Sequence, residues 1–147
     1  MSSFLITSRT LYALILTDMY LNTELAFHST KNARISLLIG HFVVMLLILF
    51  TIFLLMWNTF LFLYGLLGSL FQELKEFVIL FPIYLISSIS FNIWKELSDV
   101  PLNSFYNFTF ILHSILSILF YASALNASLK LGNPKMYNED LYFQDEK

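Results

Sequence analysis

Residues 35–72 read ISLLIGHFVVMLLILFTIFLLMWNTFLFLYGLLGSLFQ, and no Asp, Glu, Lys or Arg interrupts them. A helix needs roughly 20 apolar residues to cross a hydrocarbon core of about 30 Å. As a single helix with a rise of about 1.5 Å per residue, this run would be about 57 Å long. We therefore predict one membrane-spanning helix over residues 37–71 that is longer than the bilayer is thick. Such a helix must tilt, project into solvent or bend, and the Gly65–Gly68 region is the expected place for a bend.

Small and polar residues recur along this run in steps of four and three. Lipid gives no hydrophobic reason for helices to associate, so membrane interfaces use small residues for close approach and polar side chains for hydrogen bonds. We therefore predict that the long helix is the one against which the others pack. The predicted helix-packing seam consists of Gly40, Thr51, Asn58, Gly65 and Gly68, with Ser88, Ser114 and Ser117 on the later helices.

Composition indicates an integral membrane protein. Of the 147 residues, 58% are hydrophobic and 12% are charged, and the mean hydropathy is +0.73. Soluble domains contain about 25% charged residues. A formal net charge of −2 provides no basic surface for nucleic acid. The chain has no cysteine, which excludes disulfides and thiolate metal sites. We predict a single domain with the lipid bilayer as its principal partner.

Three further apolar segments are predicted to span the membrane: residues 4–22, 77–94 and 105–129. With residues 37–71 they make an all-α protein, a bundle of four transmembrane helices followed by a short polar tail over residues 132–147. The first segment is the weakest of the four, because Arg9 and Asp18 interrupt it. Taken alone, it fits a surface helix equally well.

Four spans place both termini on the same side of the membrane. That side carries Lys75, Lys130, Lys135 and Lys147, with Arg9 just inside, and the other side carries Lys31, Arg34 and Lys95. Positively charged residues favour the cytoplasmic side of a membrane. We therefore predict that both termini lie in the cytoplasm.

The last predicted span ends at a turn. Gly132, Asn133 and Pro134 follow Lys130 and combine a glycine C-cap with a proline stop. We predict a left-handed backbone at Gly132, a conformation that disfavours any other residue. This turn would set the direction in which the tail leaves the helix.

Polar side chains inside the predicted spans are the candidates for chemistry: Asp18, Asn22, His41 and His113. A carboxyl near the end of a span is costly unless it finds water, a cap or a partner helix. Metal sites on helices place ligands at i, i+3 or i+4, and neither histidine has such a neighbour. Two interpretations stay open: hydrogen bonds between packed helices, or part of an ion or proton path.

Sequence motifs of catalysis are missing. No serine lies in a nucleophile-elbow context, and there is no phosphate-binding glycine loop. We predict no enzymatic activity, no cofactor, no metal site and no small-molecule substrate.

Short motifs spread over most of the chain resemble those of one family. They are Asp18-Met19-Tyr20-Leu21-Asn22-Thr23 near the end of the first span, Asn58-Thr59-Phe60, Phe62, Gly65-Leu66 and Leu70-Phe71 in the long helix, Ile79-Leu80, Tyr84, Ser88-Ile89-Ser90 and Trp94 in the third span, and Leu131-Gly132-Asn133-Pro134 with Tyr137 and Leu141 after the last. On these residues the chain resembles the transmembrane protein 138 family, small four-span proteins associated with primary cilia. Gly68 and Pro82 depart from the family's pattern.

The resemblance implies a non-catalytic membrane component that helps to build cilia. Its location would be the ciliary membrane at or near the transition zone, or the membrane of an associated vesicle or vacuole, with transition-zone proteins as partners. Composition and spacing say nothing of a cilium, so this role rests on the resemblance alone. Two alternatives stay open: an accessory subunit of a large membrane complex such as a respiratory assembly, and a small channel or transporter.

Overall fold

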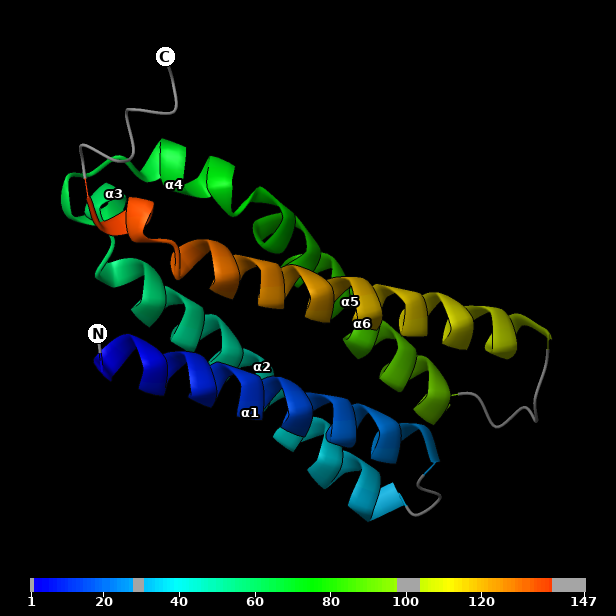
Figure 1. Cartoon of the computed structure of the whole chain (residues 1–147). Helices are drawn as coiled ribbons and strands as arrows, with labels where there is room; N and C mark the ends of the chain where they lie inside the picture. Colours follow the sequence, from blue (N-terminus) through cyan, green and yellow to red (C-terminus); the bar gives the residue numbers. More distant parts are fainter. Residues whose placement is uncertain (1, 28–30, 98–103, 139–147) are drawn as a thin grey trace. The chain divides into compact units, whose positions relative to one another are not determined.

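The helices of the computed structural model follow the apolar segments of the sequence (Figure 1). The structure describes residues 2–27, 31–97 and 104–138. Its elements are α1 (Ser2–Phe27), α2 (Lys31–Trp57), α3 (Phe60–Leu63), α4 (Leu67–Glu73), α5 (Lys75–Leu97), α6 (Ser104–Leu131) and the 3-10 helix η1 (Pro134–Tyr137). All regular structure in these ranges is helical, which confirms the all-α prediction. Most of the predicted loop before α6 and the end of the predicted tail, residues 139–147, lie outside the described residues.

Three helices are long and apolar enough to cross a membrane. The segments concerned are Ala33–Trp57 of α2, Lys75–Trp94 of α5 and Asn107–Leu131 of α6. The first predicted span, now α1, is not among them. The described chain therefore has three candidate spans where the sequence predicts four.

The predicted single helix over residues 37–71 is wrong, because α2 ends at Trp57 and two short helices follow. The Thr59 side chain accounts for the break. Its hydroxyl donates to the Met56 carbonyl at 2.7 Å and accepts from the Phe62 N–H at 3.3 Å. A threonine oxygen that accepts from a backbone N–H three residues later is the arrangement of a helix N-cap. Thr59 therefore ends one helix and begins the next.

A second turn separates α3 from α4 at Gly65, where the sequence predicts a bend. Gly65 has a φ of +73° and is the one described glycine with a positive φ. Backbone hydrogen bonds continue through the turn, from Gly65 N to Phe62 O at 3.1 Å and from Leu66 N to Leu61 O at 2.8 Å. Gly68, also predicted as part of the bend, lies inside α4.

Gly65→Leu is expected to lower the free energy of unfolding by about 1–2 kcal/mol, because the left-handed conformation is costly for any residue with a side chain. Crowding is not the reason, since a β-carbon at Gly65 would meet no atom within 4 Å. Gly68→Leu is the matched control: it has the same open space but lies in a helix, where replacing glycine is favourable. Unfolding titrations in a denaturing detergent measure both, and equal losses would contradict the assignment.

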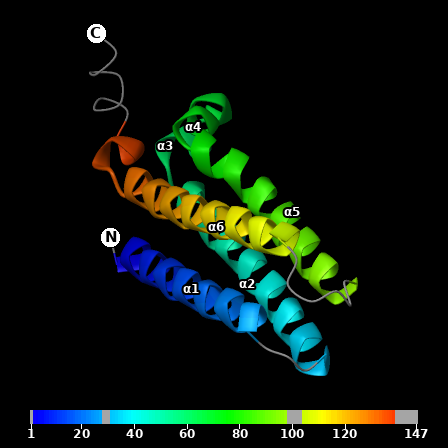
Figure 2. The same ribbon diagram turned by 90° about the vertical axis from the view of Figure 1, so that its right-hand side faces the viewer.

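The described chain divides into two units by its internal contacts. The first unit contains the chain up to Lys75 and from Leu125 onward, and the second contains Glu76–Ala124, so α6 runs through both. In the first unit α1 and α2 lie side by side (Figure 2). In the second unit aromatic side chains join α5 to α6.

Buried positions on α1 and α2 recur in steps of three and four. They are Ser8, Leu11, Ile15, Asp18 and Leu25 on α1, and His41, Met45, Ile48, Ile52 and Leu55 on α2. This spacing is typical of helices that pack lengthwise at a small crossing angle. The buried face of α2 lies one position further along the chain than the face predicted from its small residues. Of the predicted residues, Gly40 is half-buried and Thr51 is buried.

Candidate functional site

Asp18 and His41 meet between α1 and α2. The His41 Nε2 lies 3.2 Å from the Asp18 Oδ1, and the two side chains are 2% and 0% exposed respectively. Asp18 therefore has a partner side chain on the facing helix α2. This contact also gives a physical reason for the offset of the α2 face. A helix turned by one residue, about 100°, would point Gly40 instead of His41 at α1.

Asn22 and Gly40 lie close to this pair. Asn22 is half-buried one turn beyond Asp18 on α1. A β-carbon at Gly40 would lie 3.9 Å from the Leu21 Cδ1, which is ordinary van der Waals distance. Gly40 therefore lies near α1, but the contact would also admit a small side chain.

The buried pair resembles the acid and base of a catalytic triad, which would also need a nucleophile within hydrogen-bond reach. The next buried residues along the same faces are Ile15 on α1 and Met45 on α2, and the half-buried Asn22 lies one turn beyond Asp18. Within residues 2–27, 31–97 and 104–138, no three His, Asp or Glu side chains gather as metal ligands. The arrangement is that of a contact between two packed helices.

A column of four stacked rings holds His113 in the second unit. The rings alternate between α5 and α6 in the order Phe91, His113, Tyr84 and Phe120. Successive centroids are 5.1, 5.7 and 4.5 Å apart, with interplanar angles of 10°, 9° and 15°. Offset stacking of this kind contributes beyond the area that the rings bury. We call these four residues the aromatic column.

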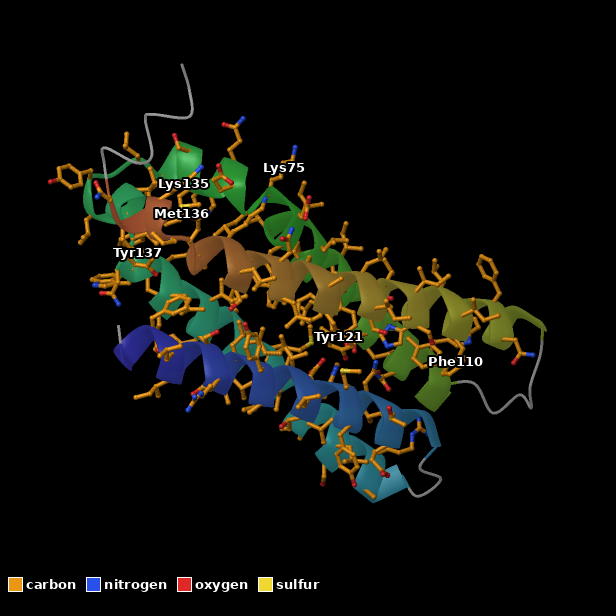
Figure 3. The ribbon with its side chains drawn as sticks, viewed as in Figure 1. Lys75, Phe110, Tyr121, Lys135, Met136 and Tyr137 are labelled. Carbon is orange, nitrogen blue, oxygen red and sulfur yellow. The ribbon has the colours of Figure 1, made fainter. Side chains whose placement is uncertain are left out.

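Hydrogen bonds between side chains flank the aromatic column. The Ser87 Oγ lies 3.3 Å from the His113 Nδ1, and the hydroxyls of Tyr84 and Tyr121 are 3.1 Å apart. Figure 3 labels Tyr121 and Phe110 on α6, and the Phe110 ring lies 6.0 Å from that of Phe91. Both histidines named from the sequence therefore contact a facing helix of their own unit.

The seam residues predicted from sequence have different environments. Ser88 and Ser117 are buried and Ser114 is half-buried. The hydroxyls of Ser114 and Ser117 donate within α6, to the carbonyls of Phe110 and Ser114, both at 2.8 Å. Serine in a helix commonly bonds back to its own preceding turn in this way.

Asn58, Gly65 and Gly68 are exposed and lie beyond the end of α2. Their predicted place on one continuous helix face with Gly40 is wrong, because Thr59 ends the helix before that face can extend to them.

The tail turn packs against the start of α1 within the first unit. Asn133 accepts from the Lys135 N–H through its Oδ1 at 3.1 Å and so caps η1, in which Pro134 is the first residue. The Tyr137 hydroxyl donates to the Leu131 carbonyl at 2.9 Å, and its ring packs edge-on against Phe4 with centroids 6.4 Å apart. Partial burial raises the pKa of the Tyr137 phenol.

Further polar contacts hold this end of α6. The Ser8 and Ser128 Oγ atoms lie 3.2 Å apart, and the Ser128 hydroxyl donates to the Tyr12 hydroxyl at 3.4 Å. Lys130 donates through Nζ to the carbonyl of Glu73, the last residue of α4, at 2.8 Å. A cation at a helix C-terminus satisfies carbonyls that have no partner inside the helix.

The left-handed backbone predicted for Gly132 is wrong, since Gly65 is the described glycine with a positive φ. Close approach is what favours glycine at Gly132. A β-carbon there would lie 3.0 Å from the Phe4 Cζ and 3.4 Å from the Leu129 carbonyl oxygen. The turn therefore needs a small residue because α1 packs against it.

Gly132→Val is expected to lower the free energy of unfolding by about 1–3 kcal/mol, the usual cost of overpacking, because the added methyls displace the Phe4 ring. Phe4→Ala made in the Gly132→Val background should recover part of that loss, since it removes the ring in the way. A double-mutant cycle on detergent-purified protein measures the coupling. Additive losses would show that Phe4 and Gly132 do not share this contact.

Three of these contacts were not predicted from the sequence, namely the Thr59 cap, the Lys130–Glu73 contact and the Phe4–Gly132 approach. Thr59 carried a usable signal, because an Asn-Thr pair ahead of an apolar run is typical of a helix start. The other two depend on how the helices pack and have no local signal.

The long apolar helices with paired polar side chains in their cores define an integral membrane protein of the all-α class. Residues 34–146 match the family described as Transmembrane protein 138. The chain belongs to this family. It is similar to mouse (Mus musculus) Transmembrane protein 138, with 30% identity over 101 residues, a stretch that covers 65% of this chain and 62% of the mouse protein. The match thus spans about three fifths of the relative's length. No solved structure matches the chain.

Proposed function

We propose that this chain is a non-catalytic membrane component that takes part in building cilia. Its place would be at or near the ciliary transition zone, or on vesicles that feed it, in contact with other membrane proteins there. The observation that carries the proposal is family membership over residues 34–146, together with the resemblance to ciliary four-span proteins. A fold alone would not support a function.

The packing of the intramembrane polar groups supports a non-catalytic role. Asp18 and His41 are nearly fully buried against each other, and His113 is stacked between Phe91 and Tyr84. Catalytic groups have to reach a substrate as well as each other. Polar side chains committed to neighbouring helices suit a scaffold better than a reaction centre or an ion path.

We further propose that α1 is a fourth span. Phe4 and Ser8 near its start contact Tyr137 and Ser128 at the other end of the chain. With the start of α1 and the end of α6 at one membrane surface, the helices from α1 to α6 cross an even number of times, whereas α2, α5 and α6 alone give three crossings. With 26 residues α1 is about 39 Å long, enough to cross. Asp18 does not oppose the crossing, because it faces His41.

The proposed orientation places both termini in the cytoplasm, because more lysines lie on that side. Epitope tags on the two ends of the full chain, probed with protease in sealed vesicles of known orientation, test it. Cleavage of both tags from the cytoplasmic face is the expected result. Tags cleaved from opposite faces would mean three crossings, and protection of both would invert the orientation.

Rescue in ciliated cells that lack their own Transmembrane protein 138 tests the proposed role. The full chain with a fluorescent tag should concentrate at the ciliary base and restore the fraction of ciliated cells, as the resident protein does in parallel. Purification under mild detergent should recover transition-zone membrane proteins. Recovery of respiratory subunits instead, without rescue, would favour an accessory subunit of another complex.

A further inference from the structure

The chain between α2 and α5 begins and ends at one membrane surface. The candidate spans on either side end at Trp57 and begin at Lys75. The helices between them, α3 and α4, have 4 and 7 residues. A crossing needs roughly 20 helical residues, so neither can span. Residues 58–74, which we call the surface segment, therefore stay at the membrane face where α2 ends.

The surface segment has an inner side and an outer side. Thr59, Leu61, Leu70 and Leu74 are buried. The outer side carries large apolar side chains: Leu63, Tyr64, Leu66, Leu67 and Phe71. Leu63 is 68% exposed and Tyr64 is 69% exposed. In an aqueous loop each such side chain would forgo about 1.5–3 kcal/mol of burial.

The backbone of the surface segment suits a partly dry environment. Where water is scarce, each unsatisfied backbone group costs several kcal/mol. Both turns retain backbone hydrogen bonds, including Thr59 N to Met56 O at 2.9 Å and Leu66 N to Leu61 O at 2.8 Å. Two further backbone bonds lie at the two ends of α4. They run from Leu70 N to Leu66 O at 3.2 Å and from Leu74 N to Leu70 O at 3.1 Å. These bonds satisfy part of the backbone polar groups of the turns within the protein, although Leu66 provides no side-chain cap for α4.

Contacts with neighbouring elements place the surface segment level with the ends of α2 and α6. Trp57, exposed at the end of α2, packs on Phe62 with ring centroids 5.0 Å apart, and tryptophan prefers the headgroup level of a bilayer. At the other end Lys130 of α6 donates to the Glu73 carbonyl. α3 also lies beside η1, which carries Lys135, Met136 and Tyr137 (Figure 3). The segment therefore lies at the level where α6 ends.

We propose that the surface segment lies in the plane of the membrane, with Leu63, Tyr64 and Leu67 inserted among the acyl chains just below the lipid headgroups. Lipid is the occupant of its outer side because the segment follows one candidate span in the sequence at Trp57, directly precedes another at Lys75, and exposes large apolar side chains. Short apolar elements bind in this boundary through their buried apolar area. The start of α1 contacts η1, which lies beside α3, so the segment links the tail turn to the lipid beneath it.

Single cysteines carrying an environment-sensitive fluorophore test the proposal directly, because the chain has no native cysteine. Leu63→Cys, Tyr64→Cys and Leu67→Cys are labelled in the full protein and reconstituted into phosphatidylcholine vesicles. Gln72→Cys, at an exposed polar position of α4, and Leu46→Cys, at an exposed apolar position of α2, are the controls. The fluorescence of each labelled variant is measured with three quenchers in turn. These are aqueous iodide, lipid with a nitroxide near the headgroup (the shallow quencher), and lipid with a nitroxide near the end of the acyl chain (the deep quencher).

The expected result is that labels at Leu63, Tyr64 and Leu67 are quenched severalfold more by the shallow nitroxide than by the deep one, and hardly by iodide. Gln72 should respond to iodide and Leu46 to the deep nitroxide. Iodide quenching at Leu63 and Tyr64 equal to that at Gln72 would make the segment an aqueous loop. A response like that of Leu46 would mean a deeply inserted segment, and protection from all three quenchers would mean that protein covers this side. Any of these results would overturn the proposal.

Discussion

His41→Leu is expected to lower the free energy of unfolding by about 3–5 kcal/mol, the scale of loss when one partner is removed from a buried pair of ionisable side chains. Its side chain and that of Asp18 are almost inaccessible, with the Nε2 and Oδ1 atoms 3.2 Å apart. Leucine there would place a hydrocarbon side chain against the buried Asp18 carboxyl and remove its contact with α2, which is costly in an apolar surrounding. Unfolding by titration with a denaturing detergent measures the loss.

The double variant Asp18→Leu/His41→Leu separates the charge from the packing. Replacing both members of a buried pair by apolar residues is often neutral or stabilising, so the double variant should be more stable than His41→Leu alone. Phe42→Leu, at the exposed neighbouring position, is the matched control and should change little. If the double variant were as unstable as the single one, the loss would come from the shape of the His41 ring and not from its contact with Asp18.

The Asp18–His41 contact also illustrates what the sequence could predict. Each residue stood out alone, because a polar side chain in an apolar run needs a partner. Their meeting could not be read from spacing, since it depends on the register between two helices. The sequence prediction chose the packing face of α2 by its small and polar residues, and so placed Gly40 and Thr51 on one face with Asn58. The structure instead places large side chains such as Met45 and Ile48 on the buried face, one position away.

The break after α2 was hidden for a different reason. The run over residues 35–72 contains neither proline nor charge, so length and hydropathy alone favoured a continuous helix. What ends α2 is one hydroxyl, Thr59, bonded both backward and forward. The Asn58-Thr59 pair offered a cap signal, but asparagine in an apolar run is equally consistent with a packing contact. The turn at Gly65 was predictable because glycine is the residue that tolerates its positive φ.

Phe120→Ala is expected to cause the largest loss in the second unit. Phe120 is fully buried and stacks on Tyr84, with Phe77 and Phe81 at centroid distances of 6.2 and 6.0 Å. In water-soluble proteins Phe→Ala costs about 3–5 kcal/mol, as a transfer term plus a cavity term. Lipid is as apolar as the helix interior and largely removes the transfer term. The remaining cavity term leads us to expect a loss of about 2–3 kcal/mol.

Phe108→Ala is the matched control, because it removes the same ring from an exposed position of the same helix and opens no internal cavity. It should change the free energy of unfolding by only a small fraction of the Phe120→Ala loss. A double-mutant cycle that combines Phe120→Ala with Tyr84→Ala should also give a coupling free energy between the two rings. Stacked rings contribute about 0.5–1.5 kcal/mol beyond the burial of their area. Equal losses from Phe108→Ala and Phe120→Ala would show that the rings alternating between α5 and α6 do not hold these helices together.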